Sequence, residues 1–177
     1  MVYRVYVEKK PGQTHEATGL FKEVQAFLQI KGLESVRVLN RYDAENLEKS
    51  LFDYAVGTVF SEPQVDDVSF EVPSGSIVFA VEPLPGQFDQ RADSAAQCIQ
   101  ILGQCDRPII RSAKVYVLEG DLSEADIAAI KKHVINPVEC REAALEMPAT
   151  LTVEYALPQS VATVDGFISM RDRKSVV

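Results

Sequence analysis

The chain has 177 residues, of which 46% are apolar, a composition typical of a globular protein with a hydrophobic core. Its 26 acidic and 18 basic residues give a net charge of −8, so no extended basic surface is available for nucleic acid. One or two arginines suffice to bind one small anion, so this composition does not exclude such a ligand. No apolar run approaches the roughly 20 residues that span a bilayer, and three cysteines without metal-type spacing are typical of a reducing compartment. We expect a cytoplasmic protein that binds neither nucleic acid nor a membrane.

The first half of the chain predicts the order strand, helix, strand, helix, strand. Residues 2–8 alternate between two faces, with Tyr3, Val5 and Val7 on one side, residues 36–39 are expected to form a short strand, and residues 68–72 alternate again. Residues 16–30 and 47–59 carry apolar side chains at helical spacing. The face of the first helix that we expect to be buried comprises Ala17, Leu20, Phe21, Val24, Phe27 and Leu28, and Gly32 is expected to end this helix in a left-handed conformation.

The second half repeats this order. Strands are expected at residues 77–82 and 109–118, and helices at residues 92–102 and 123–134. The last helix carries a capping signature, because Ser123 can accept a hydrogen bond from the backbone of Asp126 while the Asp126 carboxylate reaches back. Its buried face is expected to consist of Ile127, Ile130 and Val134.

An internal duplication relates the two halves. The tripeptide Pro11-Gly12-Gln13 recurs as Pro85-Gly86-Gln87, and Pro63 recurs as Pro137, all at an offset of 74 residues. We therefore expect an α+β fold of two ferredoxin-like units in residues 1–150, with halves of about 1–74 and 75–150 related by a pseudo-twofold axis. Each unit would form an antiparallel sheet with helices on one face, and the two sheets would either stack or join edge to edge.

The C-terminal residues continue no pattern from upstream. Residues 151–155 alternate, and we interpret residues 151–171 as a linker toward a synthetase domain that this chain lacks. The last six residues, 172–177, resemble one reading frame of a common sequencing adapter. We expect those six residues to be a non-biological tail.

Four segments carry a resemblance to a known family: residues 33–42, 79–100, 111–120 and 136–139. The strongest of these is residues 79–100, which includes the Pro-Gly-Gln-Phe-Asp-Gln-Arg run. The chain resembles the N-terminal domain of the long, single-chain form of phosphoribosylformylglycinamidine synthase, in the variety common in anaerobic bacteria. This resemblance extends over nearly all of residues 1–170.

The resemblance implies an ATP- and glutamine-dependent C–N ligase of purine biosynthesis. Such an enzyme activates the formylglycinamide ribonucleotide amide with ATP and magnesium, and then introduces ammonia taken from glutamine. In that family the ATP-using centre and the glutaminase cysteine lie in downstream synthetase and glutaminase domains. The N-terminal domain there resembles two copies of a small subunit and serves assembly, so this chain alone is expected to be inactive and to hold no cofactor.

The residues that could carry chemistry by themselves form no catalytic pattern. No phosphate-binding loop of the GxxxxGK[ST] or GxGxxG type is present. We expect Cys98 to be buried, since Ala95 and Ile99 share its helix, and buried cysteines are usually inert. The sequence offers Cys105 and Cys140 no metal partners, and His15 and His133 are interpreted as surface residues.

Residues 85–94 are the candidate functional segment. A Pro-Gly turn leads into a helix start that is rich in polar side chains and also holds an apolar one, Phe88, which is unusual for an exposed loop. The ordinary interpretation is a capped turn; the functional one is a junction that binds an anion or docks a partner. Our hypothesis is that this segment faces the synthetase domain near the substrate or the ammonia path. The candidate residues are Gln87, Phe88, Asp89, Gln90, Arg91, Asp93 and Ser94.

Three other functions compete with an assembly domain. The first is a regulatory ferredoxin-like module that binds a small effector in a polar pocket between its halves. A freestanding small enzyme has no supporting constellation of residues. RNA binding is disfavoured, because the best exposed-aromatic candidates, Phe79 and Tyr116, lie in acidic surroundings.

Overall fold

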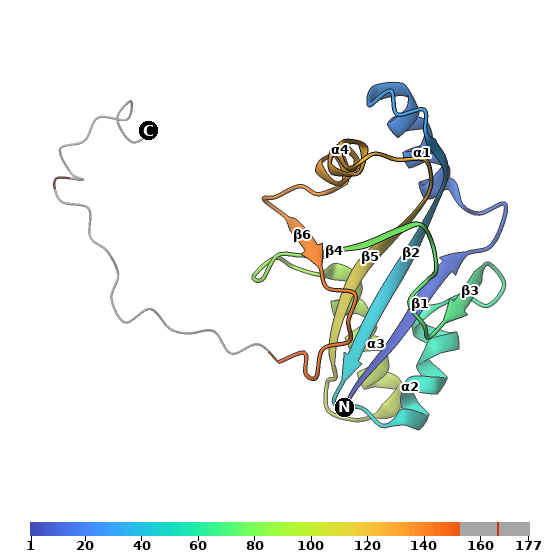
Figure 1. Ribbon diagram of the computed structural model, residues 1–177. Coiled ribbons are helices and arrows are strands. Elements are labelled where there is room, and N and C mark those ends of the chain that lie inside the picture. Colours follow the sequence, from blue (N-terminus) through green and yellow to red (C-terminus); the bar gives the residue numbers. More distant parts are fainter. Residues whose placement is uncertain (153–165, 167–177) are drawn as a thin grey trace.

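Six segments of the chain pair into one antiparallel sheet, and helices fill the connections (Figure 1). The computed structural model describes residues 1–152 and residue 166. The fold class is α+β, as the sequence predicts. In chain order the elements are β1 (Val2–Lys9), α1 (His15–Phe27), β2 (Leu33–Glu45), α2 (Lys49–Ala55), the π-helical turn η1 (Val56–Phe60), β3 (Asp66–Ser69), β4 (Ile77–Pro83), α3 (Gln90–Gly103), β5 (Ile109–Gly120), α4 (Glu124–Val134) and β6 (Cys140–Ala143).

The strands lie in the order β3-β1-β2-β5-β4-β6, and every neighbouring pair is antiparallel. The two longest strands, β2 and β5, pair along most of their length in the middle of the sheet, with Asn40 opposite Lys114. Because of this central pairing the described residues form one continuous sheet, and the stacked arrangement of two sheets is wrong.

Helices α1 to α4 cover the same face of the sheet. Val5 is opposite Tyr42 on neighbouring strands, and Phe79 is opposite Tyr116, so the side chains of each pair share a face. One apolar cluster joins Val5 and Tyr42 to α2 and α3, and a second joins Phe79 and Tyr116 to α1 and α4. Figure 1 accordingly places α1 and α4 toward one end of the sheet and α2 and α3 toward the other. The buried helix residues at the centres of these clusters are Phe52, Ala95 and Ile99 in the first, and Val24 and Ile130 in the second.

The opposite face of the sheet is covered by irregular chain. Its apolar residues, among them Tyr6, Leu39 and Val117, are almost fully buried. The connection between β3 and β4 crosses above them, since a Cβ added to Gly75 would lie 2.2 Å from Cγ1 of Val117. Leu145, which follows β6, packs on the same cluster.

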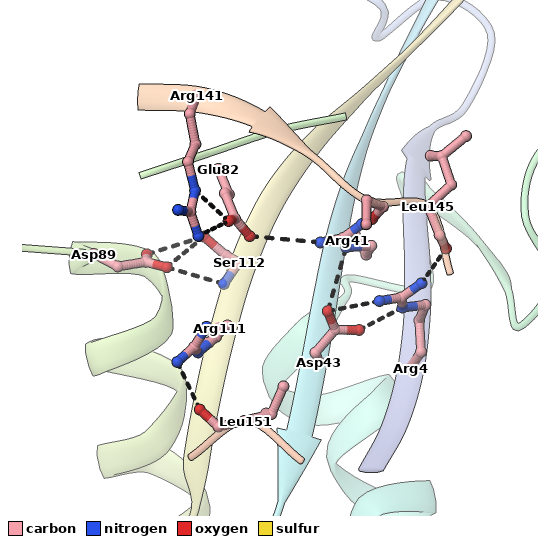
Figure 2. A network of polar contacts seen from close by, with 11 residues as sticks. Arg4, Arg41, Asp43, Glu82, Asp89, Arg111, Ser112, Arg141, Leu145 and Leu151 are labelled. Atoms are coloured by element: carbon pink, nitrogen blue, oxygen red, sulfur yellow. Dashed lines mark hydrogen bonds and ion pairs between the residues drawn. The ribbon is translucent and has the colours of Figure 1, made fainter. Parts of the chain in front are cut away.

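A polar network fixes that second covering segment to the sheet (Figure 2). The Arg41 guanidinium donates to the carbonyl of Ala144 at 2.7 Å, and Arg4 donates to the carbonyl of Leu145 at 2.5 Å. Asp43 lies between the two arginines and pairs with both. These two hydrogen bonds therefore fix the position of residues 144 and 145 against the sheet.

β2 and β3 differ most from their predicted bounds. β2 begins earlier and ends later than residues 36–39, because it pairs with β1 on one side and β5 on the other. β3 ends at Ser69, so a strand over residues 68–72 is wrong, and Phe70 and Val72 are exposed. The reason is local: the Ser69 hydroxyl bonds with the backbone of Glu71 and turns the chain toward its crossing of the sheet.

The start of α4 is confirmed, whereas the end of α1 is not as predicted. Ser123 and Asp126 form both halves of the capping box. Phe27 is exposed, and the left-handed residue after α1 is Gln29 instead of Gly32. Gly32 is needed for a different reason, because a Cβ there would lie 2.1 Å from the carbonyl oxygen of Asp121.

The division of residues 1–150 into two halves stays a prediction. Of the expected linker at residues 151–171, only Leu151, Thr152 and Gly166 belong to the described part, and the tail at residues 172–177 lies outside it. Among the helices that the structure describes, none is both long and apolar enough to span a bilayer.

Candidate functional site

The candidate segment at residues 85–94 forms a tight turn that leads into α3. Gly86 adopts a φ of 91°, and the backbone N–H of Gln87 donates to the carbonyl of Leu84 at 2.9 Å. The side-chain amide of Gln87 also donates to the carbonyl of Val138 at 3.2 Å. This bond connects the turn to the loop before β6. Phe88 and Val138 present exposed side chains at this place, with 74% and 71% of their surface accessible.

Asp89 has a structural role. Its carboxylate accepts the backbone N–H of Ala92 at 2.9 Å as the N-cap of α3. It also accepts the backbone N–H and the hydroxyl of Ser112 on β5, both at 2.9 Å (Figure 2). The interpretation as an ordinary capped turn therefore applies to Asp89, which anchors the start of α3 to the sheet.

The remaining polar candidates differ in what their side chains contact. Asp93 lies on the surface of α3, where it pairs with Arg107 and accepts from the amide of Gln97 at 2.6 Å. Gln90 and Ser94 are exposed and line a shallow depression that they share with Arg91. Arg91 is the candidate that reaches the sheet, because it donates to the hydroxyl of Tyr42 at 3.1 Å.

Arg91 lies where two open cavities meet on the helical face of the sheet. One cavity, of about 450 Å³, lies beside α1, and the other, of about 560 Å³, lies beside α3. Both include Asn40 and Arg91 in their walls. Several lining residues of one cavity are 74 positions away from lining residues of the other: Val7 and Val81, Gln13 and Gln87, Thr14 and Phe88, Tyr42 and Tyr116.

The floor of this shared site comes from the central strand pair. Asn40 and Lys114 lie opposite each other on β2 and β5. The Lys114 ammonium pairs with Glu16 in the first turn of α1, and Arg91 approaches from the first turn of α3. The sequence analysis did not single out Asn40, Lys114 or Glu16. The sequence feature that could have pointed to Asn40 and Lys114 is the offset of 74 residues, because these two residues are themselves 74 positions apart.

Electrostatics keep two donors of the site protonated. Burial, aided by the nearby carboxylate of Glu16, raises the pKa of Tyr116 to about 12, so its hydroxyl remains neutral at physiological pH. Burial acts to lower the pKa of Arg91, but the hydrogen bond to Tyr42 and the charges of Glu16 and Asp89 more than offset it and raise that pKa. Arg91 therefore stays a cation in the site.

The three cysteines lie within the described residues and are free thiols. Cys98 is exposed, so its predicted burial is wrong: the buried stripe of α3 runs through Ala92, Ala95 and Ile99 and leaves Cys98 at its edge. No cysteine in residues 1–152 hydrogen-bonds to a histidine, and the thiol of Cys140 donates to a backbone carbonyl. No group of three or more potential metal-binding side chains gathers within the described part of the chain.

Comparison with known proteins adds no family assignment. No protein-family model matches the sequence. A search of curated proteins found no match either.

Proposed function

We propose that this chain is the N-terminal assembly domain of phosphoribosylformylglycinamidine synthase, a glutamine-dependent ligase of purine biosynthesis. In this role the chain has no activity alone, and it acts in the cytoplasm. ATP, magnesium and the reacting groups belong to the downstream synthetase and glutaminase domains, which are its partners. The observation that carries the proposal is the strand order, which reads the same from either edge when β1, β2 and β3 are exchanged for β4, β5 and β6.

The central register supports a duplicated pair of ferredoxin-like units. Leu39 pairs with Val115, and Arg41 pairs with Ala113. Residue 113 is 74 positions after Leu39, and residue 41 is 74 positions before Val115, so exchanging the two halves turns the first pair into the second. A pseudo-twofold axis between Asn40 and Lys114 would require this relation. A duplicated small subunit is what the family resemblance implies, and the symmetric register supports that inference.

The exposed apolar pair beside the candidate segment supports a docking role. Phe88 and Val138 are both largely exposed, whereas the positions 74 residues earlier are Thr14 and Gln64. Exposed aromatic side chains in loops are a common mark of protein interfaces. At both positions the exposed apolar side chain belongs to residues 75–150, and its counterpart in residues 1–74 is polar. We therefore infer that residues 75–150 contact the synthetase domain.

The segment after β6 gives the domain a defined exit. Arg4, Arg41 and Arg111 donate to backbone carbonyls of this segment, at Leu145, Ala144 and Leu151 respectively. Because these bonds hold the chain against the sheet up to residue 151, a downstream domain would be joined to a fixed position. A fixed exit is useful for a domain whose role is to position its neighbours.

The proposal is tested by glutamine- and ammonia-dependent synthetase activity. The assay is run on the 177-residue chain alone, and then on its mixture with a separately made synthetase–glutaminase portion of a related enzyme. We expect no activity from the chain alone and a restored activity in the mixture. Activity of the chain alone, or a mixture no more active than the synthetase–glutaminase portion, would contradict the assembly role.

A further inference from the structure

The cavity beside α3 contains hydrogen-bond donors that the protein itself does not use. Arg91 has five N–H groups, and the contact with Tyr42 uses one of them. The side chains of Asn40 and Tyr116, which line the same cavity, have no hydrogen-bond partner among the described residues. Three side chains from three elements, each with unused donors, thus line one cavity.

The neighbouring cation, Lys114, is held by a pair that a ligand could replace. Its partner Glu16 has 55% of its side chain exposed, and Lys114 has 43% exposed. Exposed ion pairs contribute little to stability, so exchanging this carboxylate for another anion costs little. Lys114 can therefore join Arg91 in binding an anionic group.

The rest of the cavity is partly apolar and partly polar, with Glu82, Gln87, Ser112 and Glu139 among its polar lining residues. Val81, Phe88 and Val134 line it, and the ring of Tyr116 adds an aromatic wall. The cavity volume of about 560 Å³ lies within the range typical of small-molecule sites, which are mostly apolar with a few convergent polar groups. The organic part of a small ligand would fit in the cavity beside Arg91 and Lys114.

We propose that this cavity binds a small organic anion, with a carboxylate or phosphate group at Arg91, Lys114 and Asn40 and an apolar or planar part against Phe88 and Tyr116. The shared chemistry is an oxyanion that accepts several hydrogen bonds. This site stands on the cavity alone and does not depend on the assembly role, because it is complete within residues 1–152. The cavity beside α1 differs in that Thr14 stands there at the position of Phe88.

The test is a titration of the 177-residue chain, followed by NMR and calorimetry. Four probes test which anionic group binds and which apolar or planar part is preferred: inorganic phosphate, ribose 5-phosphate, succinate and benzoate. We expect saturable binding of at least one probe, with shifted amide signals at Asn40, Arg91 and Lys114. A preference for the two phosphates or for the two carboxylates identifies the anion. If no probe saturates, the proposal is overturned.

A charge series separates ligand contact from a structural effect. Arg91→Gln is expected to raise the Kd of the best probe at least about ten-fold, the loss typical of one charged hydrogen bond. Glu16→Gln is expected to lower that Kd about three-fold, because it frees Lys114 and removes a competing carboxylate. Lys22→Gln, on the exposed part of α1, is the matched control and should change nothing.

The sign of the Glu16 effect is decisive. If Arg91 and Glu16 were merely structural, both variants would weaken binding or leave it unchanged, and either result would contradict the proposed site. Urea unfolding of each variant checks that the fold is intact. Arg91→Lys gives a second measure, since it keeps the charge and should bind more tightly than Arg91→Gln does.

Discussion

Arg4 and Asp43 share two hydrogen bonds across neighbouring strands, of 2.5 and 2.9 Å, and their side chains are only 3% and 4% exposed. A second guanidinium, that of Arg41, has its Nε 3.3 Å from the same carboxylate. One buried carboxylate therefore lies between two buried cations, Glu82 lies a further 4.0 Å from Arg41, and backbone carbonyls of residues 144 and 145 accept hydrogen bonds from the two arginines. The stability of this face depends on Asp43.

Asp43→Ala is expected to lower the free energy of unfolding by about 3 kcal/mol, because it leaves two buried cations without their shared carboxylate. Equilibrium unfolding in urea measures the change. The control is Asp53→Ala, which removes an exposed partner of Lys49 within α2 and should cost less than about 0.5 kcal/mol. Equal losses in the two variants would show that Asp43 does not compensate buried charge.

The contact between Glu45 and the segment after β6 predicts a pH dependence. Hydrogen bonds from the backbone N–H of Leu151, at 2.7 Å, and from Thr150 lower the pKa of Glu45. A carboxyl whose pKa is lower in the folded state stabilises the fold above its unfolded pKa, and this contribution disappears as the pH falls through the folded value. We expect stability to decrease below about pH 4.5.

Glu45→Gln should reduce this acid sensitivity, because the amide can still accept the bonds but cannot titrate. Urea unfolding at a series of pH values from about 7 down to about 3 compares the variant with the wild type. If both lose stability in parallel below about pH 4.5, the contact with Leu151 does not contribute to the pH dependence.

Two isoleucines of α3 test the helix phase. Ile99 is fully buried in the cluster with α2, and Ile101 is 75% exposed. Ile99→Ala should lower the free energy of unfolding by about 3 kcal/mol through lost burial and a residual cavity. Ile101→Ala should change it by less than about 0.5 kcal/mol. Comparable effects in urea unfolding would contradict the assigned orientation of α3.

Two glycines should respond with opposite signs. A Cβ at Gly32 would lie 2.1 Å from the Asp121 carbonyl oxygen, so Gly32→Ala forces the backbone apart and should cost about 2 kcal/mol. Gly19 lies inside α1 with nothing within 4 Å of an added Cβ. Gly19→Ala should therefore stabilise the protein by about 0.5 kcal/mol. Thermal unfolding of both variants decides the signs.

The periodicity of the sequence was sufficient to predict most elements. Alternation predicted β1, the strand expected at residues 77–82 is β4, helical spacing predicted α1 and α3, and the Ser123–Asp126 signature predicted the start of α4. One failure occurs where a local hydrogen bond between Ser69 and Glu71 interrupts the alternating pattern. Phe70 and Val72 alternate like a strand, yet the chain there leaves the sheet edge to cross its far face.

The candidate site was only partly predictable. The turn before α3 follows from local chemistry, so Gln87, Phe88 and Arg91 could be identified from their sequence context. Asn40 and Lys114 come together because β2 and β5 are neighbours in one register, which the sequence pattern does not specify. Cys98 was misassigned because one position of error in helical phase turns a side chain from the core to the solvent.

We propose that this chain is an assembly domain that docks through Phe88. The most direct measurement is a binding titration of the 177-residue chain with the separately made synthetase–glutaminase portion of a related enzyme. We expect a one-to-one complex that Phe88→Asp weakens at least about ten-fold. Phe27→Asp is the matched control, because Phe27 is 77% exposed but distant in sequence from the candidate turn, and it should leave the affinity unchanged. No complex, or equal affinity of wild type and Phe88→Asp, would contradict the claim.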